Sequence, residues 1–304
     1  MPLISVFTPT YNRAGKLHRV FDSLTKQTFK NFEWVIVDDG SKDDTKQLID
    51  KFIEQQPFFS IQYSYQENSG KAIAINSGVK MALGEWFYIA DSDDALIPQA
   101  LEILMDAWKV IPESEKNSYS GIVACCKDQF GKRISNEVPG GVYNGNWRDL
   151  FYKQRFRREA TNINKLKCLK EFPFPDQFKG IYIAEAITWR RMSDKYKIRL
   201  ISDEVRIYFM ENSTDSIIYR HKKYIHKALS SCVEIKDALD KDLSYFFYFP
   251  SYFMKMALLY HAYRPFLKGW SRSVVKLNKN AGIFAAIFMI PGLLLHLIFL
   301  VKGK

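Results

Sequence analysis

Apolar and polar residues recur with two different periods along the first 110 residues, and this pattern predicts strands separated by helices. The short apolar runs of strand length are residues 3–7, 33–37, 61–66 and 86–90. The stretches in which apolar residues recur at helical spacing are residues 16–27, 45–55 and 71–83. Because alternating strands and helices build a mostly parallel sheet with helices on both faces, an α/β fold is expected.

The pattern changes twice further along the chain. Residues 111–220 are less regular, with a strand predicted over 121–127 and a helix over about 184–196. After a boundary near residues 219–223, a basic and aromatic tail follows. We therefore expect one α/β domain over 1–220, divided at about residue 110, and a helical appendage over 221–304.

Polar loops follow the predicted strands at their carboxyl ends. The loops are residues 8–12, 38–41, 67–71 and 91–94. In open parallel sheets the ligand crevice lies beyond the carboxyl ends of the strands, so one crevice is expected to collect all four loops.

Three carboxylates, Asp91, Asp93 and Asp94, stand together where an apolar strand ends. Like charges at such close spacing repel unless a cation holds them. A hard divalent cation, Mg²⁺ or Mn²⁺, with a phosphate oxygen completing its shell, fits this pattern. The alternative is a solvated acidic turn that caps a helix beginning near Pro98.

Two further loops carry polar groups suited to a nucleotide. Asp38 and Asp39 can accept hydrogen bonds from a base or a ribose, or they simply open the next helix with Ser41 as its cap. The loop at 8–12 lacks the glycines of a dinucleotide or P-loop site, which excludes those classes. Its Tyr11 can stack on a base or pack at the surface.

These motifs, in this order and spacing, resemble the family 2 glycosyltransferases of the GT-A fold, a Rossmann-like fold found in bacterial enzymes of polysaccharide assembly. The segments that carry the resemblance are Val6–Asn12, Val35–Ser41, Asn68–Lys71 with Asn76–Gly78, and Asp91–Asp94. The resemblance covers residues 1–110 well and extends more loosely to about 220.

The resemblance implies an inverting transfer of a sugar from a nucleotide-diphosphate sugar, most often a UDP-sugar, with Mn²⁺ or Mg²⁺ as cofactor. Residues 1–110 would bind the nucleotide sugar, and 111–220 would supply the acceptor site and the base. Asp93 would bind the metal, and Asp91 the ribose or donor sugar. The other residues that it assigns to donor binding are Thr8, Pro9, Tyr11, Asp38, Asp39, Lys71 and Ser92.

An inverting enzyme also needs a base for the acceptor hydroxyl. In the family this base is a carboxylate at the start of a helix. It belongs to a Glu-Asp pair, and a Trp follows four residues after the Asp. Here Glu185 stands four residues before Trp189, and Ala184 replaces the preceding acidic residue. Glu185 is therefore the expected base, with Asp176 and Asp203 as the alternatives, although a first-turn carboxylate also suits the helix dipole alone.

The pair Arg157–Arg158 resembles a segment of members that act on lipid-linked acceptors. Guanidinium groups suit a phosphate, so acceptor or phosphate binding is expected there, with a solvated basic loop as the alternative. The expected acceptor is a saccharide or a polyprenyl-diphosphate-linked acceptor.

The charge of the chain is concentrated in the tail. No Asp or Glu follows Asp242, and eight Lys or Arg residues do, out of a formal net charge of +11. The segment 281–301 has no Asp, Glu, Lys or Arg and would make a helix of about 31 Å, enough to cross a bilayer core. The tail could bind nucleic acid, a partner protein or a membrane. The long uncharged segment favours membrane lipid, and no nucleic acid is expected.

The tail can meet a membrane in two ways. Pro291–Gly292 interrupts the uncharged run, and a full span would carry the final lysines across the bilayer. An embedded or interfacial anchor is therefore favoured over a span. The chain has no secretory-signal pattern at its start, and its four cysteines form no metal-binding pattern, so the cytoplasmic face of a cell membrane, a bacterial inner membrane, is the expected location.

Together these features predict a metal-dependent, inverting glycosyltransferase of cell-surface polysaccharide biosynthesis. A protein on the same scaffold that binds sugar nucleotides or lipid phosphates without turnover is the alternative. The carboxylates at Asp93 and Glu185 favour the enzyme.

Overall fold

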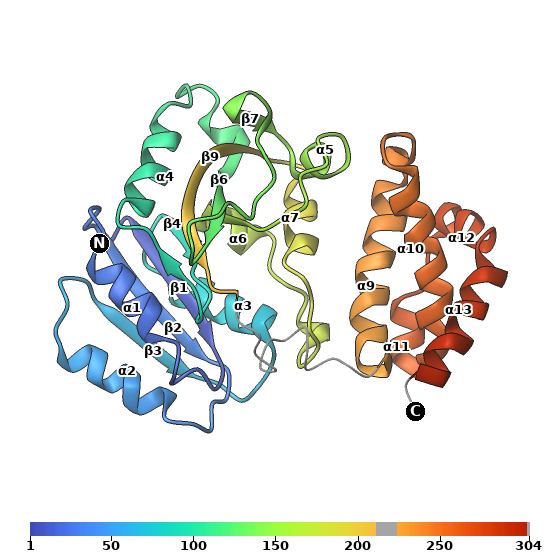
Figure 1. Ribbon diagram of the computed structural model, residues 1–304, viewed down its shortest axis with the longest axis horizontal. Coiled ribbons are helices and arrows are strands. Elements are labelled where there is room, and N and C mark those ends of the chain that lie inside the picture. The colour runs from blue at the N-terminus through green and yellow to red at the C-terminus, as the bar shows by residue number, and fades with distance from the viewer. Residues whose placement is uncertain (211–223, 303–304) are drawn as a thin grey trace. The chain divides into compact units, whose positions relative to one another are not determined.

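The computed structural model describes residues 1–210 and 224–302, which form two compact units (Figure 1). The first unit comprises Met1–Gly180 and Thr188–Met210. The second comprises Ile181–Ile187 and the described residues of the helical region that follows 223. The boundary expected near 219–223 lies outside the described residues.

A single twisted sheet organises the first unit. Its strands lie in the order β3-β2-β1-β4-β8-β6-β9-β5, and β7 pairs with β9. The strands β1 to β4 pair with one another in the parallel sense, and so do β6 and β9, while β8, β5 and β7 pair with their neighbours in the antiparallel sense. The bounds are β1 Ile4–Thr10, β2 Phe32–Asp38, β3 Ile61–Tyr65, β4 Trp86–Ile89, β5 Ala95–Leu96, β6 Tyr119–Asp128, β7 Val142–Gly145, β8 Ala160–Lys165 and β9 Lys197–Tyr208.

Alternate side chains of the parallel strands face two helical layers. Ile4, Val6 and Trp34 pack into one buried cluster with α1 (His18–Thr25), α2 (Thr45–Glu54) and α4 (Ala100–Lys109). On the opposite face Phe7 lies against α3 (Lys71–Met81), where a Cβ at Gly78 would stand 2.2 Å from the Phe7 ring. The predicted sheet with helices on both faces is confirmed.

The first 110 residues follow the sequence pattern closely, and the next hundred do not. All four strands and three helices predicted before residue 90 are present, with ends shifted by a few residues. The two-residue strand β5 of the first 110 residues was not predicted, nor were the strands β7, β8 and β9 of the next hundred, which carry no clear period. The short helices of this region are α5 (Trp147–Tyr152), α6 (Leu166–Glu171) and α7 (Ala186–Met192), and its 3₁₀ turns are η1 (Lys116–Ser118), η2 (Pro139–Gly141) and η3 (Asp176–Phe178).

The second unit is helical, and α10 lies at its centre, packed against α9, α12 and α13. His261 of α10 places Nε2 2.9 Å from Ala285 O of α12, and His296 of α13 places Nδ1 2.9 Å from Ala262 O. Gly292 lets α13 approach closely, because a Cβ there would stand 2.7 Å from Leu258 O. The bounds are α9 Tyr224–Asp242, η4 Leu243–Tyr248, α10 Pro250–Tyr263, η5 Arg264–Phe266, α11 Gly269–Val274, α12 Lys279–Ala286 and α13 Met289–Lys302.

The uncharged run 281–301 is bent. Among the described residues no single helix has the length and hydropathy to cross a membrane, and only the pair Lys279–Ala286 and Met289–Leu300, bent by 75°, has them jointly. The break expected at Pro291–Gly292 is instead at residues 287–288. Pro291 is the third residue of α13, where the first turn requires no N–H donor, so the helix accommodates it.

Candidate active site

The loops that follow β1 and β2 are held together by hydrogen bonds at the carboxyl edge of the sheet. The Asn12 N–H donates to Ser41 Oγ at 2.8 Å, and the Lys42 N–H donates to Asn12 Oδ1 at 2.8 Å. Asn12 has φ of +52°, a conformation that Asn tolerates better than most residues. This places the loop of Tyr11 beside the loop of Asp39, as parallel strands require.

Asp39 ties the second loop to the third. Its carboxylate accepts the N–H groups of Ser69 and Gly70, each at 2.8 Å, and the Gln66 side-chain amide at 2.7 Å. A carboxylate offers about four lone pairs, so Asp39 keeps capacity for one more donor. Asp38 instead accepts from the Ser41 N–H and the Tyr63 hydroxyl, and is 1% exposed.

The acidic loop after β4 lies among cationic side chains. Lys71 Nζ, from the start of α3, lies 2.5 Å from Asp91 Oδ1. Arg13 Nη2 lies 3.3 Å from Asp93 Oδ2. Arg206 of β9 reaches Asp91 at 3.3 Å and Asp94 at 3.6 Å. Cationic side chains of the protein therefore offset part of the negative charge of these carboxylates.

These ion pairs give the carboxylates different pKa values. Burial acts to raise the pKa of Asp91, and Lys71 and Arg206 outweigh it, so that the pKa lies below its ordinary value. Burial raises the pKa of Asp94 to about 7 against the opposing effect of Arg206, and the charges of Asp91 and Asp93 add to the rise. Asp91 is thus held as an anion beside Lys71.

Arg206 was not anticipated from the sequence. Its side chain is 7% exposed, and besides Asp91 and Asp94 it donates to Glu159 Oε2 at 2.7 Å. It lies in β9, whose sequence has no apolar periodicity that would predict a strand. Its partner Asp91 is 115 residues away in sequence. Arg13 was also missed, although it directly follows the loop at 8–12.

The remaining donor-site expectations fall into two groups. Thr8 is fully buried and its Oγ1 accepts from Trp34 Nε1 at 2.9 Å. Pro9 and Ser92 are also buried, whereas Tyr11 is half-buried. Of these four, Tyr11 has the exposure that stacking on a ligand requires.

Arg157 and Arg158 are exposed on a loop of the first unit. Both backbone N–H groups donate to Asn136 Oδ1, at 2.8 and 3.0 Å, so the turn that presents them is defined. The next residue, Glu159, accepts from Arg206, which links this loop to Asp91 through a single guanidinium.

Glu185 directly precedes α7 and is half-buried. It lies in Ile181–Ile187, which belongs to the second unit, whereas Asp91 and Asp93 belong to the first. Of the alternative bases, Asp176 accepts from Asn76 Nδ2 at 3.3 Å within the first unit, and Asp203 lies on β9.

The residues present fit a metal ion that takes few protein ligands. No group of three His, Cys, Asp or Glu side chains in the described ranges could hold a metal by itself. Asp93 is the most exposed of the three carboxylates, at 37% of its side chain. Mg²⁺ is commonly held by one or two carboxylates with substrate phosphates and water completing its shell, so Asp93 fits this arrangement.

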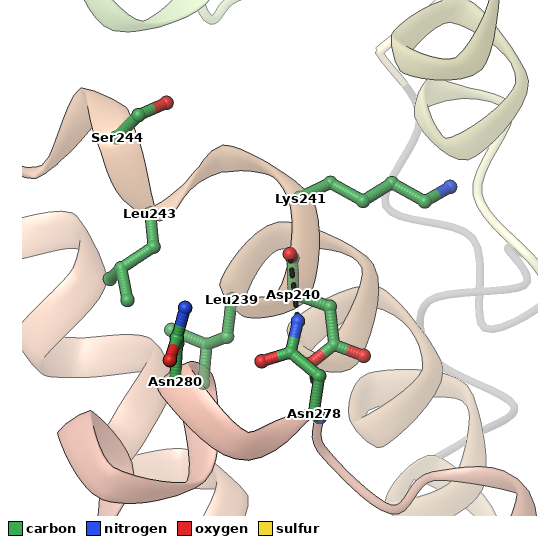
Figure 2. A pocket seen from close by; sticks show the side chains of 7 residues that line it. All are labelled: Leu239, Asp240, Lys241, Leu243, Ser244, Asn278 and Asn280. Atoms are coloured by element: carbon green, nitrogen blue, oxygen red, sulfur yellow. Dashed lines mark hydrogen bonds between the residues drawn. The ribbon is translucent and has the colours of Figure 1, made fainter.

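A cavity of about 330 Å³ lies in the second unit (Figure 2). It lies where the end of α9, η4 and the start of α12 meet, and none of its lining residues was predicted to bind donor, acceptor or metal. The Asn278 side-chain amide, which donates to Asp240 O at 3.0 Å, holds the helix ends together there.

The fold and the carboxyl-edge loops form an α/β protein whose polar loops gather at one edge of its sheet, and the family follows from direct comparison. The model described as Glycosyl transferase family 2 matches residues 5–165, more than half of the chain, and the chain belongs to this family. The resemblance to GT-A glycosyltransferases is confirmed.

Relatives in sequence cover much of the chain. A GalNAc(5)-diNAcBac-PP-undecaprenol beta-1,3-glucosyltransferase of Campylobacter jejuni is 27% identical over 96% of this chain and 94% of its own. Glycosyltransferase GlyG of Streptococcus pneumoniae is 39% identical over 68% of this chain and 70% of its own. The chain spans only 30% and 35% of the length of the matching glycosyltransferases of Rickettsia prowazekii and Rickettsia felis.

Solved structures share the fold. TarS of S. aureus, residues 1–349 in complex with UDP-GlcNAc, superposes with a TM-score of 0.57 at 19% identity, over 96% of this chain and 89% of that one. The mannosyltransferase PcManGT of Pyrobaculum calidifontis, in complex with GDP-Man and Mn²⁺, superposes with a TM-score of 0.55 at 18% identity, over 99% and 87%.

Proposed function

We propose that this family 2 glycosyltransferase transfers a sugar, with inversion, from a nucleoside-diphosphate sugar to a hydroxyl of a lipid-linked saccharide in the assembly of cell-surface polysaccharide. The observation that carries the proposal is the meeting of Asp39, the Lys71–Asp91 pair and Asp93 at the carboxyl edge of four parallel strands. Open α/β sheets bind their ligands at this edge. The family match includes all of these residues.

The donor-binding roles follow from accessibility and from spare hydrogen-bonding capacity. Asp39 has room for one further donor, such as a base imide, and Tyr11 has a half-exposed ring for stacking. Asp91, kept anionic beside Lys71, can accept a ribose or sugar hydroxyl, while Lys71 contributes positive charge toward a diphosphate. We propose a UDP-sugar as donor, since the fold relative TarS was solved with UDP-GlcNAc.

Asp93 is the proposed ligand of Mn²⁺ or Mg²⁺. Its half-exposed carboxylate is the accessible member of the acidic cluster, and a fold relative was solved with Mn²⁺. A bound dication supplies electrostatic stabilisation for the negative charge that the departing diphosphate develops.

Glu185 is the proposed general base. Its carboxylate would take the proton of the acceptor hydroxyl as that oxygen bonds to the anomeric carbon and the bond to the diphosphate breaks. The bonding electrons leave with the diphosphate, and attack opposite the leaving group inverts the anomeric centre. The place of Glu185 immediately before α7, four residues ahead of Trp189, supports this role.

The proposed acceptor is a polyprenyl-diphosphate-linked saccharide at the cytoplasmic face of a bacterial inner membrane. The Campylobacter jejuni relative, which matches over almost its whole length, is named for an undecaprenol-linked substrate. Arg157 and Arg158 are exposed and suited to a phosphate. Exposed apolar residues of α12 and α13, among them Ile283 and Ile290 at 63% and 70% exposure, favour contact with membrane lipid.

The test is a thermal-shift panel of UDP-, GDP- and dTDP-sugars with Mn²⁺, followed by assay of released nucleoside diphosphate. One donor should raise the melting temperature of the wild type, because a ligand of the folded state stabilises it. Asp93→Asn should lose the Mn²⁺-dependent part of this shift and keep the fold. A panel without any shift contradicts the donor class, and a shift without turnover on any lipid-linked acceptor favours the non-catalytic alternative.

A further inference from the structure

Each carboxylate of the acidic loop already has a cationic partner within the first unit. The carboxylates of Asp91, Asp93 and Asp94 face three cationic side chains, namely Lys71, Arg13 and Arg206. Arg206 also contacts a fourth carboxylate, Glu159, so the charges are not matched one to one, but a dication at Asp93 would still meet the positive charge of Arg13. Binding of a metal at Asp93 is therefore opposed by Arg13, unless this cation is displaced or additional negative charge arrives.

The three cations differ in how firmly they are held. Lys71 and Arg206 contact Asp91 together, and Arg206 is 7% exposed with ion-pair contacts to three carboxylates. Arg13 pairs with Asp93 alone among the described ion pairs, at 3.3 Å, and Asp93 is the most exposed carboxylate of the cluster. The Arg13–Asp93 pair is therefore the one that opens at least cost.

The backbone of Arg13 stays in place when its side chain moves. Its N–H donates to Thr45 Oγ1 at 3.0 Å, and its carbonyl accepts the N–H groups of Lys16 and Leu17 at 2.9 and 3.0 Å. A change of side-chain rotamer could thus remove the guanidinium from Asp93 without altering the loop. The freed guanidinium has the fork geometry that matches phosphate oxygens.

We propose that Arg13 holds the cation position on Asp93 in the donor-free protein, and that a divalent cation takes this position only together with a diphosphate, to which Arg13 then turns. The inference rests on the proposed metal-dependent function. It makes metal and diphosphate binding mutually dependent, because the negative charge of the diphosphate balances both the metal and the released guanidinium. Metal alone then binds weakly, since it must compete with Arg13 for a single carboxylate.

The test measures Mn²⁺ binding directly, by the electron paramagnetic resonance signal of free Mn²⁺, with the full chain in the absence and presence of UDP or GDP. In the wild type the nucleotide should tighten Mn²⁺ binding at least about tenfold, or about 1.4 kcal/mol. Arg13→Gln should bind Mn²⁺ without nucleotide about tenfold more tightly than the wild type, and the nucleotide should then add correspondingly less.

Arg19→Gln is the matched control. Arg19 donates to the backbone carbonyl of Asp93 at 3.0 Å and lies over the Phe209 ring, so the variant removes one neighbouring charge and leaves the Arg13–Asp93 pair in place. Its Mn²⁺ affinity should change by less than about threefold. Asp93→Asn gives the baseline, in which Mn²⁺ associates with the nucleotide in solution only.

Each outcome of these Mn²⁺-binding measurements supports or overturns the inference. An unchanged or weakened Mn²⁺ affinity in Arg13→Gln overturns the inference, and so does an equal gain in Arg19→Gln, which would reflect general charge. If Arg13→Gln fails to fold, absence of nucleotide dependence in the wild type overturns it. If no variant binds Mn²⁺ even with nucleotide, both the metal part of the proposed function and this inference fail, while donor binding without metal would leave the transferase proposal standing.

Discussion

Arg206 holds together carboxylates that would otherwise repel one another. Its buried guanidinium contacts Asp91 of the acidic loop, Asp94 three residues further in the same loop, and Glu159 from the loop that presents Arg157 and Arg158. A buried charge that loses its partner costs more than an exposed pair contributes. At the scale of residues, the acidic site therefore depends on a side chain that need not touch substrate.

Replacing Arg206 by Gln should lower the free energy of unfolding by about 3 kcal/mol, because Asp91 and Asp94 lose a buried partner. Urea unfolding of the full chain measures this loss. Lys46→Gln, which breaks the exposed pair with Asp50, is the control and should cost less than about 0.5 kcal/mol. An equal loss of unfolding free energy in the two variants would show that the ion pairs of Arg206 do not stabilise the fold more than an exposed pair does.

Glu185→Gln should reduce sugar transfer by about 10² to 10⁴ while donor affinity persists, because the amide keeps the size of the side chain and cannot accept the proton. Transfer assays and calorimetric donor binding measure the two effects separately. Asp176→Asn and Asp203→Asn serve as comparisons. Near wild-type transfer by Glu185→Gln, with loss in one of the other two, would move the base to that residue.

At the scale of elements, the packing of α10 against α12 places an imidazole in a partly buried setting. Burial lowers the pKa of His261, against the effect of its contact with Ala285 O, and Arg264 lowers it further. The unfolded chain therefore takes up a proton at higher pH than the folded chain does. Above about pH 6.5 the imidazole is neutral in both states and does not affect the free energy of unfolding. As the pH falls below that value, the unfolded chain binds a proton first, and the folded protein loses stability.

His261→Gln should accordingly lose less stability than the wild type between pH 7.5 and pH 5.0, since glutamine can occupy the site without titrating. The measurement is the difference in unfolding free energy between the two proteins as a function of pH. His18→Gln, on the exposed side of α1, is the control. A difference that does not change with pH would mean that His261 is protonated alike in both states.

At the scale of the whole molecule, exposed apolar residues gather in the second unit. Ile290, Leu294 and Leu297 stand on one face of α13 at intervals of four and three residues, with exposures of 70%, 59% and 57%. A bend of 75° separates α12 from α13. The neighbouring basic residues suit anionic lipid, at about 1 kcal/mol for each Lys or Arg near the surface.

Changing Ile290, Leu294 and Leu297 together to Glu should release the protein from anionic vesicles, because the apolar face is lost and negative charge is added. Vesicle sedimentation measures the bound fraction, which should fall at least about tenfold. The matched control is the triple Glu variant at Leu83, Val110 and Phe130, which are exposed apolar residues of the first unit. Equal retention of both variants on vesicles would exclude α13 as the anchor.

Sequence alone determined the part of the molecule in which neighbours in the chain are neighbours in the fold. The strands and helices before residue 90 follow from apolar period. The meeting of Asp39, Asp91 and Asp93 at one edge follows from the rule that parallel strands share a carboxyl end. The glycosyltransferase family follows from the same loops.

Only the tertiary structure decided which charges meet and where the tail bends. Arg206 reaches Asp91 across 115 residues and Glu159 across 47, from a strand paired at the far side of the sheet. Thr8 is fully buried, and its side chain shares a sheet face with Trp34. The tail bends at 287–288 rather than at Pro291, because helix ends are chosen by packing against α10 as well as by local propensity. Contacts between distant segments leave no periodic trace in the sequence, and so they must be seen in space.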